Sequence, residues 1–150
     1  MNALTNEPDA EDSAAATTPP EKTRKRPKPG ERRVQILQTL AQMLEQPGAE
    51  RVTTAALAAK LSVSEAALYR HFASKAQMFE GLIEFIESSV FTLVNQIVER
   101  EPSGAQQAQR ILSVLLGFGE KNPGMVRVMV GDALVFEHER LIARMNQFFD

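Results

Sequence analysis

The stretch that most constrains the fold runs from residue 53 to residue 75, with the sequence TTAALAAKLSVSEAALYRHFASK. Thr53 or Thr54 is placed to cap a short first helix and Ser64 to cap a second, because their hydroxyl groups accept hydrogen bonds from first-turn N–H groups. The serine–valine pair at 62–63 predicts a tight turn between them. Alanines at the expected crossing point allow close packing, as in a helix-turn-helix. An ordinary helical hairpin is the alternative at this point.

Charge is distributed unevenly along the chain. Residues 1–21 carry five acidic and no basic residues. Residues 22–75 carry 11 basic and 4 acidic residues, a net charge of +7. Residues 76–150 carry 6 basic and 10 acidic residues, a net charge of −4. A polyanionic partner would therefore meet the N-terminal half. Residues 1–30 lack apolar periodicity, so we expect a disordered charged tail there. Its basic run either adds phosphate contacts or is simply solvated.

The rest of the chain reads as an all-α fold with no convincing strand. Hydrophobic residues make up 43% of the sequence and recur at helical spacing, which predicts a helical core. The further helices are expected at 31–45, 74–99, 105–120, from residue 123, and from residue 133 or 134. We expect three parts: the tail 1–30, a DNA-binding unit 31–75 and a partial helical core 76–150.

The absence of cysteine, of a signal peptide and of an apolar run of membrane-spanning length predicts a cytoplasmic protein with no membrane partner. Enzymatic chemistry has little support. The two histidines, His71 and His138, lie in separate elements, and Glu137 and Glu139 do not share a helical face with His138. The glycine spacing of 117–124 does not match a nucleotide-binding loop. No catalytic residue, metal ligand or cofactor is expected.

The helix-turn-helix residues fall where DNA contacts are needed. If the second helix enters the major groove, its first turn faces the bases. There the Ser64 hydroxyl donates or accepts, and the small Ala66 permits contact with a thymine methyl group. Glu65 either accepts from a cytosine amino group or simply favours the helix dipole. The remaining DNA contacts are expected at helix ends, from Thr53, Thr54, Tyr69, Arg70, His71, Ser74 and Lys75. Tyr69 packing in the fold and Lys75 being solvated are the alternatives.

A possible docking surface lies outside this unit. Phe85 falls off the apolar stripe of its helix, so either a neighbouring helix packs against it or it belongs to a docking surface. The GFGEKNPG stretch at 117–124 places two glycines near a helix end, which predicts close packing or fraying. We place Gly117, Lys121 and Asn122 in one candidate groove with Phe85.

Residues 53–87 resemble the TetR family of DNA-binding regulators. The family pattern is a threonine-started helix, a V-S turn, L-Y-x-H-F and a lysine three residues later. It is met by Thr53-Thr54, Val63-Ser64, Leu68-Tyr69, His71-Phe72 and Lys75. The family commonly has glycine where this chain has Ser62. The resemblance implies a two-fold dimer on a palindromic duplex, with half-sites about one helical turn apart.

A closer resemblance, to family members that act in nucleoid occlusion, covers about residues 32–150. It rests on SEAALYRHF, GLIEFIE, LLGFGEKNPG and ALVFEHERLIARMNQFF. It implies a second partner, the tubulin-like division protein FtsZ, met at the candidate groove. A DNA-bound protein of this kind blocks division-ring assembly over the chromosome. The runner-up is a ligand-responsive repressor with an effector pocket between the fourth and seventh helices. The apolar inward faces disfavour it, because few polar groups remain to orient a ligand.

The last apolar stripe runs to Phe148-Phe149 with no capping signal. TetR-like proteins build their dimer interface largely from two further helices. We therefore expect a shortened chain that lacks the C-terminal dimerisation helices and forms no stable dimer at micromolar concentration, which sedimentation would test.

Overall fold

The computed structural model describes residues 28–46 and 51–150, and within them it is all-α, as predicted. The elements are α1 (Pro29–Leu44), α2 (Thr54–Lys60), α3 (Glu65–Tyr69), α4 (Lys75–Arg100), α5 (Gly104–Lys121), α6 (Pro123–Met129), the 3-10 helix η1 (Asp132–Leu134) and α7 (Glu139–Phe149). The predicted tail up to residue 27 and the predicted helix end at Pro47-Gly48 lie outside the described residues.

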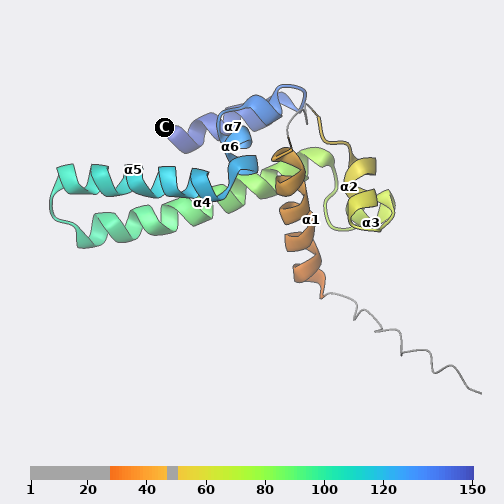
Figure 1. Cartoon of the computed structure of the whole chain (residues 1–150), viewed down its shortest axis with the longest axis horizontal. Helices are drawn as coiled ribbons and strands as arrows, with labels where there is room; N and C mark the ends of the chain where they lie inside the picture. Colours follow the sequence, from red (N-terminus) through yellow and green to blue (C-terminus); the bar gives the residue numbers. More distant parts are fainter. Residues whose placement is uncertain (1–27, 47–50) are drawn as a thin grey trace, which may run out of the picture.

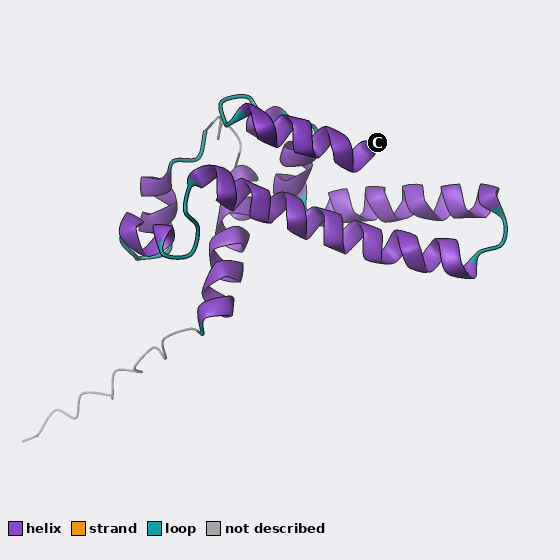
Figure 2. Ribbon diagram, turned by 180° about the vertical axis from the view of Figure 1, so that it is seen from behind, coloured by secondary structure: helices purple, strands orange, loops and turns teal. Residues whose placement is uncertain are grey.

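Helix α4 is the element around which the others are arranged. It forms a long antiparallel hairpin with α5, and α1, α2 and α3 gather near its N-terminal end (Figure 1). Seen from behind, the short helices again lie at the end opposite to the α4–α5 turn (Figure 2). Phe79, Leu82, Ile83 and Ile86 are buried on α4, where α1, α6 and α7 pack. The predicted core stripe of this helix is confirmed over these positions.

Helix α1 is held against α6 by two close contacts. An added Cβ on Gly124 would lie 2.1 Å from the Ala41 carbonyl oxygen, so only glycine fits this crossing. Arg127 Nη1 donates to the Leu44 carbonyl at 3.0 Å, which satisfies a carbonyl at the end of α1. The apolar residues that recur along α1 are buried at Ile36, Leu40, Ala41 and Leu44, whereas Val34 near the start of the helix is exposed.

Helix α5 is less covered than its pattern predicted. Ala108 and Leu112 are exposed, Ile111, Leu115 and Phe118 are half-buried, and no residue of α5 is fully buried. Gly119 makes a tight contact near the end of the helix, where an added Cβ would lie 3.2 Å from the Val126 side chain. The apolar face of α5 is therefore only partly covered within the described chain.

The start predicted for the last helix was wrong. Gly131 has a positive φ of 81°, the 3-10 helix η1 follows, and α7 begins only at Glu139. His138 is its cap residue, and His138 Nδ1 accepts from the Arg140 N–H at 3.2 Å. The predicted stripe is confirmed, because Leu141 and Met145 are buried.

The chain covers one of its two C-terminal phenylalanines. Phe148 is buried and lies edge-to-face with Phe91 at 5.3 Å between ring centroids, whereas Phe149 is exposed.

Helix α4 is long and apolar enough to cross a membrane, with a mean hydropathy of 1.3. A core helix of a soluble protein passes the same test, so this single helix is weak evidence for a membrane span.

Candidate nucleic-acid interface

Helices α2 and α3 each begin with the kind of cap that the sequence predicted. Thr53 Oγ1 accepts from the Ala56 N–H at 3.1 Å, which identifies Thr53 rather than Thr54 as the cap of α2. Ser64 Oγ accepts from the Ala67 N–H at 3.2 Å at the start of α3. Such a cap stabilises a helix by about 1 kcal/mol, which matters for helices as short as these.

The turn between α2 and α3 is a Schellman motif. The Val63 N–H donates to the Ala58 carbonyl at 3.0 Å, and the Ser62 N–H donates to the Ala59 carbonyl at 3.1 Å. Ser62 therefore occupies the left-handed position, with a φ of 55°. A side chain disfavours this conformation, which gives a physical reason for the glycine common at this position in the TetR family.

Helix α3 is anchored to the body from its far end. Leu68 and Phe72 are buried, while Arg33 on α1 donates from Nη1 to the His71 carbonyl. The Arg33 guanidinium carbon also lies 4.2 Å from the centroid of the Phe72 ring. Nothing local in the sequence links Arg33 to His71, because the two residues lie 38 positions apart.

The opposite side of α3 is open to solvent. Ser64, Glu65, Ala66, Tyr69 and Arg70 are all exposed, so the structure brings these candidate DNA contacts together on one short helix. Their solvent-facing placement is what entry of α3 into a major groove requires.

Two other candidates lie beside this face with contacts of their own. His71 is half-buried just after α3. Thr54 Oγ1 donates to Glu65 Oε2 at 2.7 Å and so links the first turns of α2 and α3. The Glu65 carboxylate therefore has a protein partner, a role that the sequence analysis did not foresee.

The first turn of α4 carries the last two candidate DNA contacts. Ser74 Oγ accepts from the Gln77 N–H at 3.2 Å, and Gln77 Oε1 accepts from the Ala73 N–H, one residue before the position of an ordinary capping box. Lys75 differs from the expected free phosphate ligand, because its ammonium group forms an ion pair with Glu137.

The candidate docking residues lie on α4 and at the end of α5. Phe85 is 47% exposed, so no neighbouring helix covers it fully. Lys121 is exposed, and Asn122 Nδ2 donates to the Phe118 carbonyl at 2.8 Å. An added Cβ on Gly117 would meet nothing within 4 Å, in contrast to Gly119. Close packing therefore explains Gly119 but not Gly117.

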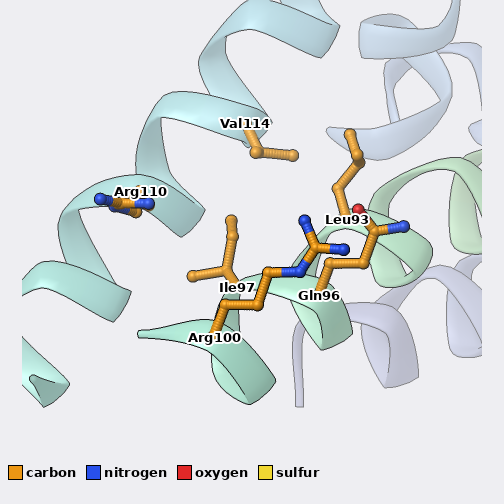
Figure 3. A pocket seen from close by; sticks show the side chains of 6 residues that line it. All are labelled: Leu93, Gln96, Ile97, Arg100, Arg110 and Val114. Carbon is orange, nitrogen blue, oxygen red and sulfur yellow. The ribbon is translucent and has the colours of Figure 1, made fainter. Parts of the chain in front are cut away.

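A hollow of about 210 Å³ lies between α4 and α5 (Figure 3). Its lining is apolar with a polar, basic edge, and consists of Leu93, Gln96, Ile97, Arg100, Arg110 and Val114. Arg110 Nη2 lies 3.2 Å from Glu101 Oε2 near the turn of the hairpin. At 100° per residue, Leu93 and Arg100 fall on the same side of α4 as Phe85.

No three side chains of histidine, cysteine, aspartate or glutamate form a metal-binding group in the part of the chain that the structure describes.

Two family profiles match separate parts of this chain. The profile of the tetR family of bacterial regulatory proteins matches residues 36–82, which span most of α1, the helix-turn-helix and the start of α4. The profile of an SlmA-like, tetracyclin repressor-like C-terminal domain matches residues 104–150. The chain therefore carries a TetR-family N-terminal domain followed by an SlmA-like C-terminal domain.

Among curated proteins the chain closely resembles nucleoid occlusion factors named SlmA. It is 57% identical to that of Aliivibrio fischeri strain MJ11 over 125 residues, which cover 83% of this chain and 64% of the relative. It is 58% identical over 123 residues to that of Marinomonas sp. strain MWYL1, covering 82% and 62%. For Vibrio vulnificus strain YJ016 the identity is 54% over 124 residues, covering 82% and 63%. The chain thus spans somewhat less than two thirds of these relatives.

Proposed function

We propose that this chain is a sequence-specific DNA-binding nucleoid occlusion factor without catalytic activity. The observation that carries the proposal is the rigidly capped, solvent-exposed α3, lying within the segment of net charge +7 and inside the part of the chain that resembles SlmA. Helix α3 enters the major groove, and the helix-turn-helix domain comprises residues 31–75.

The base contacts come from the first turn of α3, where Ser64 and Ala66 are exposed. Glu65 Oε2 accepts from Thr54, which holds α2 and α3 together, and a base contact of Glu65 would use the remaining acceptor sites of its exposed carboxylate. Tyr69, Arg70 and His71 approach the sugar-phosphate backbone. With so few side chains for direct readout, DNA shape carries part of the specificity.

The second partner in this proposal is FtsZ, whose ring assembly the DNA-bound protein inhibits over the chromosome. Its docking surface comprises Phe85, Gly117, Lys121 and Asn122 together with the hollow. A glycine inside a helix costs about 1 kcal/mol relative to alanine, so the open space at Gly117 favours a role in partner approach. Val114, which lines the hollow, and Lys121 share a side of α5 with Gly117, which supports a docking surface that follows this side of the helix.

The proposal includes an association with the nucleoid and, for the full-length family member, a two-fold dimer on a palindromic site. Two-fold symmetry would place two copies of α3 in successive major grooves on one face of the duplex.

Selection of bound duplexes from a random pool tests the DNA-binding part. We expect enrichment of a palindrome whose half-sites lie about one helical turn apart. Recovery of duplexes with no common sequence would contradict specific recognition. Release of the selected duplex by a small molecule, with no effect on FtsZ, would instead favour a ligand-responsive repressor.

A further inference from the structure

We propose that Glu137 limits DNA affinity by competing with DNA phosphates for the ammonium group of Lys75. The inference rests on the proposed DNA-binding function and adds a regulatory residue that lies outside the helix-turn-helix. In this proposal, the segment between η1 and α7 lowers the affinity of α3 and the start of α4 for DNA.

The contact joins two parts of the fold that are distant in sequence. Lys75 Nζ lies 2.5 Å from Glu137 Oε1, across 62 residues of chain. The two side chains are only 19% and 8% exposed. Solvent therefore screens this ion pair less than an exposed pair, and a competing anion must replace Glu137 rather than merely approach Lys75.

The position of Lys75 on α4 explains why two anions compete for it. Lys75 is the first residue of α4 after its Ser74 cap, at the positive end of the helix dipole, where a cation is disfavoured. A carboxylate offsets this cost. A DNA phosphate would offset it as well, and it would also accept hydrogen bonds from first-turn N–H groups. In the described structure, the carboxylate that pairs with Lys75 is that of Glu137.

Two further ion pairs fix the segment that carries Glu137. Arg140 Nε lies 2.9 Å from Glu80 Oε1, and Arg144 Nη2 lies 2.9 Å from Glu87 Oε2, so α7 is fastened along α4. The hydrogen bond that Arg144 donates to the Glu87 carboxylate is the largest cause that raises the pKa of Arg144 above its ordinary value. These pairs hold Glu137 beside Lys75 until a phosphate displaces it.

The test compares E137Q with E80Q in the 150-residue chain. E137Q keeps the shape of the side chain and frees Lys75, whereas E80Q breaks a neighbouring α4–α7 ion pair without touching Lys75. Duplex affinity is measured by fluorescence anisotropy across a salt series. We expect E137Q to bind about threefold to tenfold tighter near 0.1 M salt, with the slope of log K against log salt steeper by roughly 0.9. E80Q removes only one of the two ion pairs that hold α7 and leaves Lys75 paired with Glu137, so it should leave the slope unchanged and raise the affinity less than E137Q does.

The double variant K75M/E137Q separates this competition from a general change in the fold. The gain of E137Q should disappear in it, because no ammonium group remains to be freed. Weaker binding by E137Q would show that Glu137 positions Lys75 for DNA and would overturn the proposal, as would an unchanged slope. If the unaltered chain bound no duplex at all, the proposed function would fail together with this inference. Duplex binding with an unresponsive E137Q would contradict the inference alone.

Discussion

Ser62 holds a backbone conformation that its own side chain disfavours. Its φ of 55° closes the turn between α2 and α3, so Ser62→Gly should relieve strain at this position. We expect the free energy of unfolding to rise by roughly 0.5–1 kcal/mol, measured from the midpoint of urea denaturation. Ala59→Gly, in an ordinary helical position of α2, is the control and should lower it by about as much. A midpoint lowered by Ser62→Gly would contradict the turn geometry.

A substitution of Phe85 should remove one of the two proposed activities, inhibition of FtsZ, and leave the other, DNA binding, intact. It is 47% exposed, so Phe85→Glu should leave the fold and the duplex affinity unchanged while it abolishes inhibition of FtsZ assembly. Val98→Glu is a matched control, since Val98 is 50% exposed on a different side of the same helix. Inhibition should survive in that control. Reduced duplex affinity or a lowered melting temperature in Phe85→Glu would argue against the docking surface.

At the scale of elements, the crossing of α1 and α6 depends on one glycine. Gly124→Ala would place a methyl group 2.1 Å from a backbone carbonyl oxygen, and we expect a loss of about 1–3 kcal/mol in the free energy of unfolding. Gly117→Ala has open space around its Cβ and should instead stabilise α5 by roughly 0.5–1 kcal/mol. Equal losses in both variants, measured by thermal unfolding, would show that these two glycines do not differ as described.

Helix caps were readable from the sequence because they are local. A cap depends on a residue three positions away, so the prediction of Ser64 as a cap is confirmed, and of the two candidates Thr53 and Thr54 the structure selects Thr53. The exposure of α5 could not be predicted from the sequence, because periodicity identifies an apolar face of a helix but not the neighbouring element that covers it. The late start of α7 was missed because η1 and the turn after it lie within an apolar pattern that continues into the helix.

At the scale of the whole molecule, the two proposed binding surfaces lie apart. The helix-turn-helix lies near the N-terminal end of α4, away from the α4–α5 turn (Figures 1 and 2). The hollow is lined by Leu93, Gln96, Ile97 and Arg100 in the C-terminal half of α4 and by Arg110 and Val114 on α5. One molecule can therefore present both surfaces at once. The uneven charge and the TetR-like motif predicted that DNA binding belongs to the N-terminal half of the chain. The contacts of individual residues with DNA and with FtsZ stay predictions. The Lys75–Glu137 pair was beyond sequence reasoning, because only the tertiary fold brings the two side chains together.

The central claim is that DNA binding and inhibition of FtsZ belong to one molecule and are coupled. Light scattering of FtsZ during assembly, recorded with the chain alone, with the selected duplex and with a scrambled duplex of equal length, tests this claim most directly. We expect scattering to fall in the presence of the chain, and to fall further only when the selected duplex is added. Assembly that is unaffected by the chain, or equally affected with both duplexes, would contradict the account.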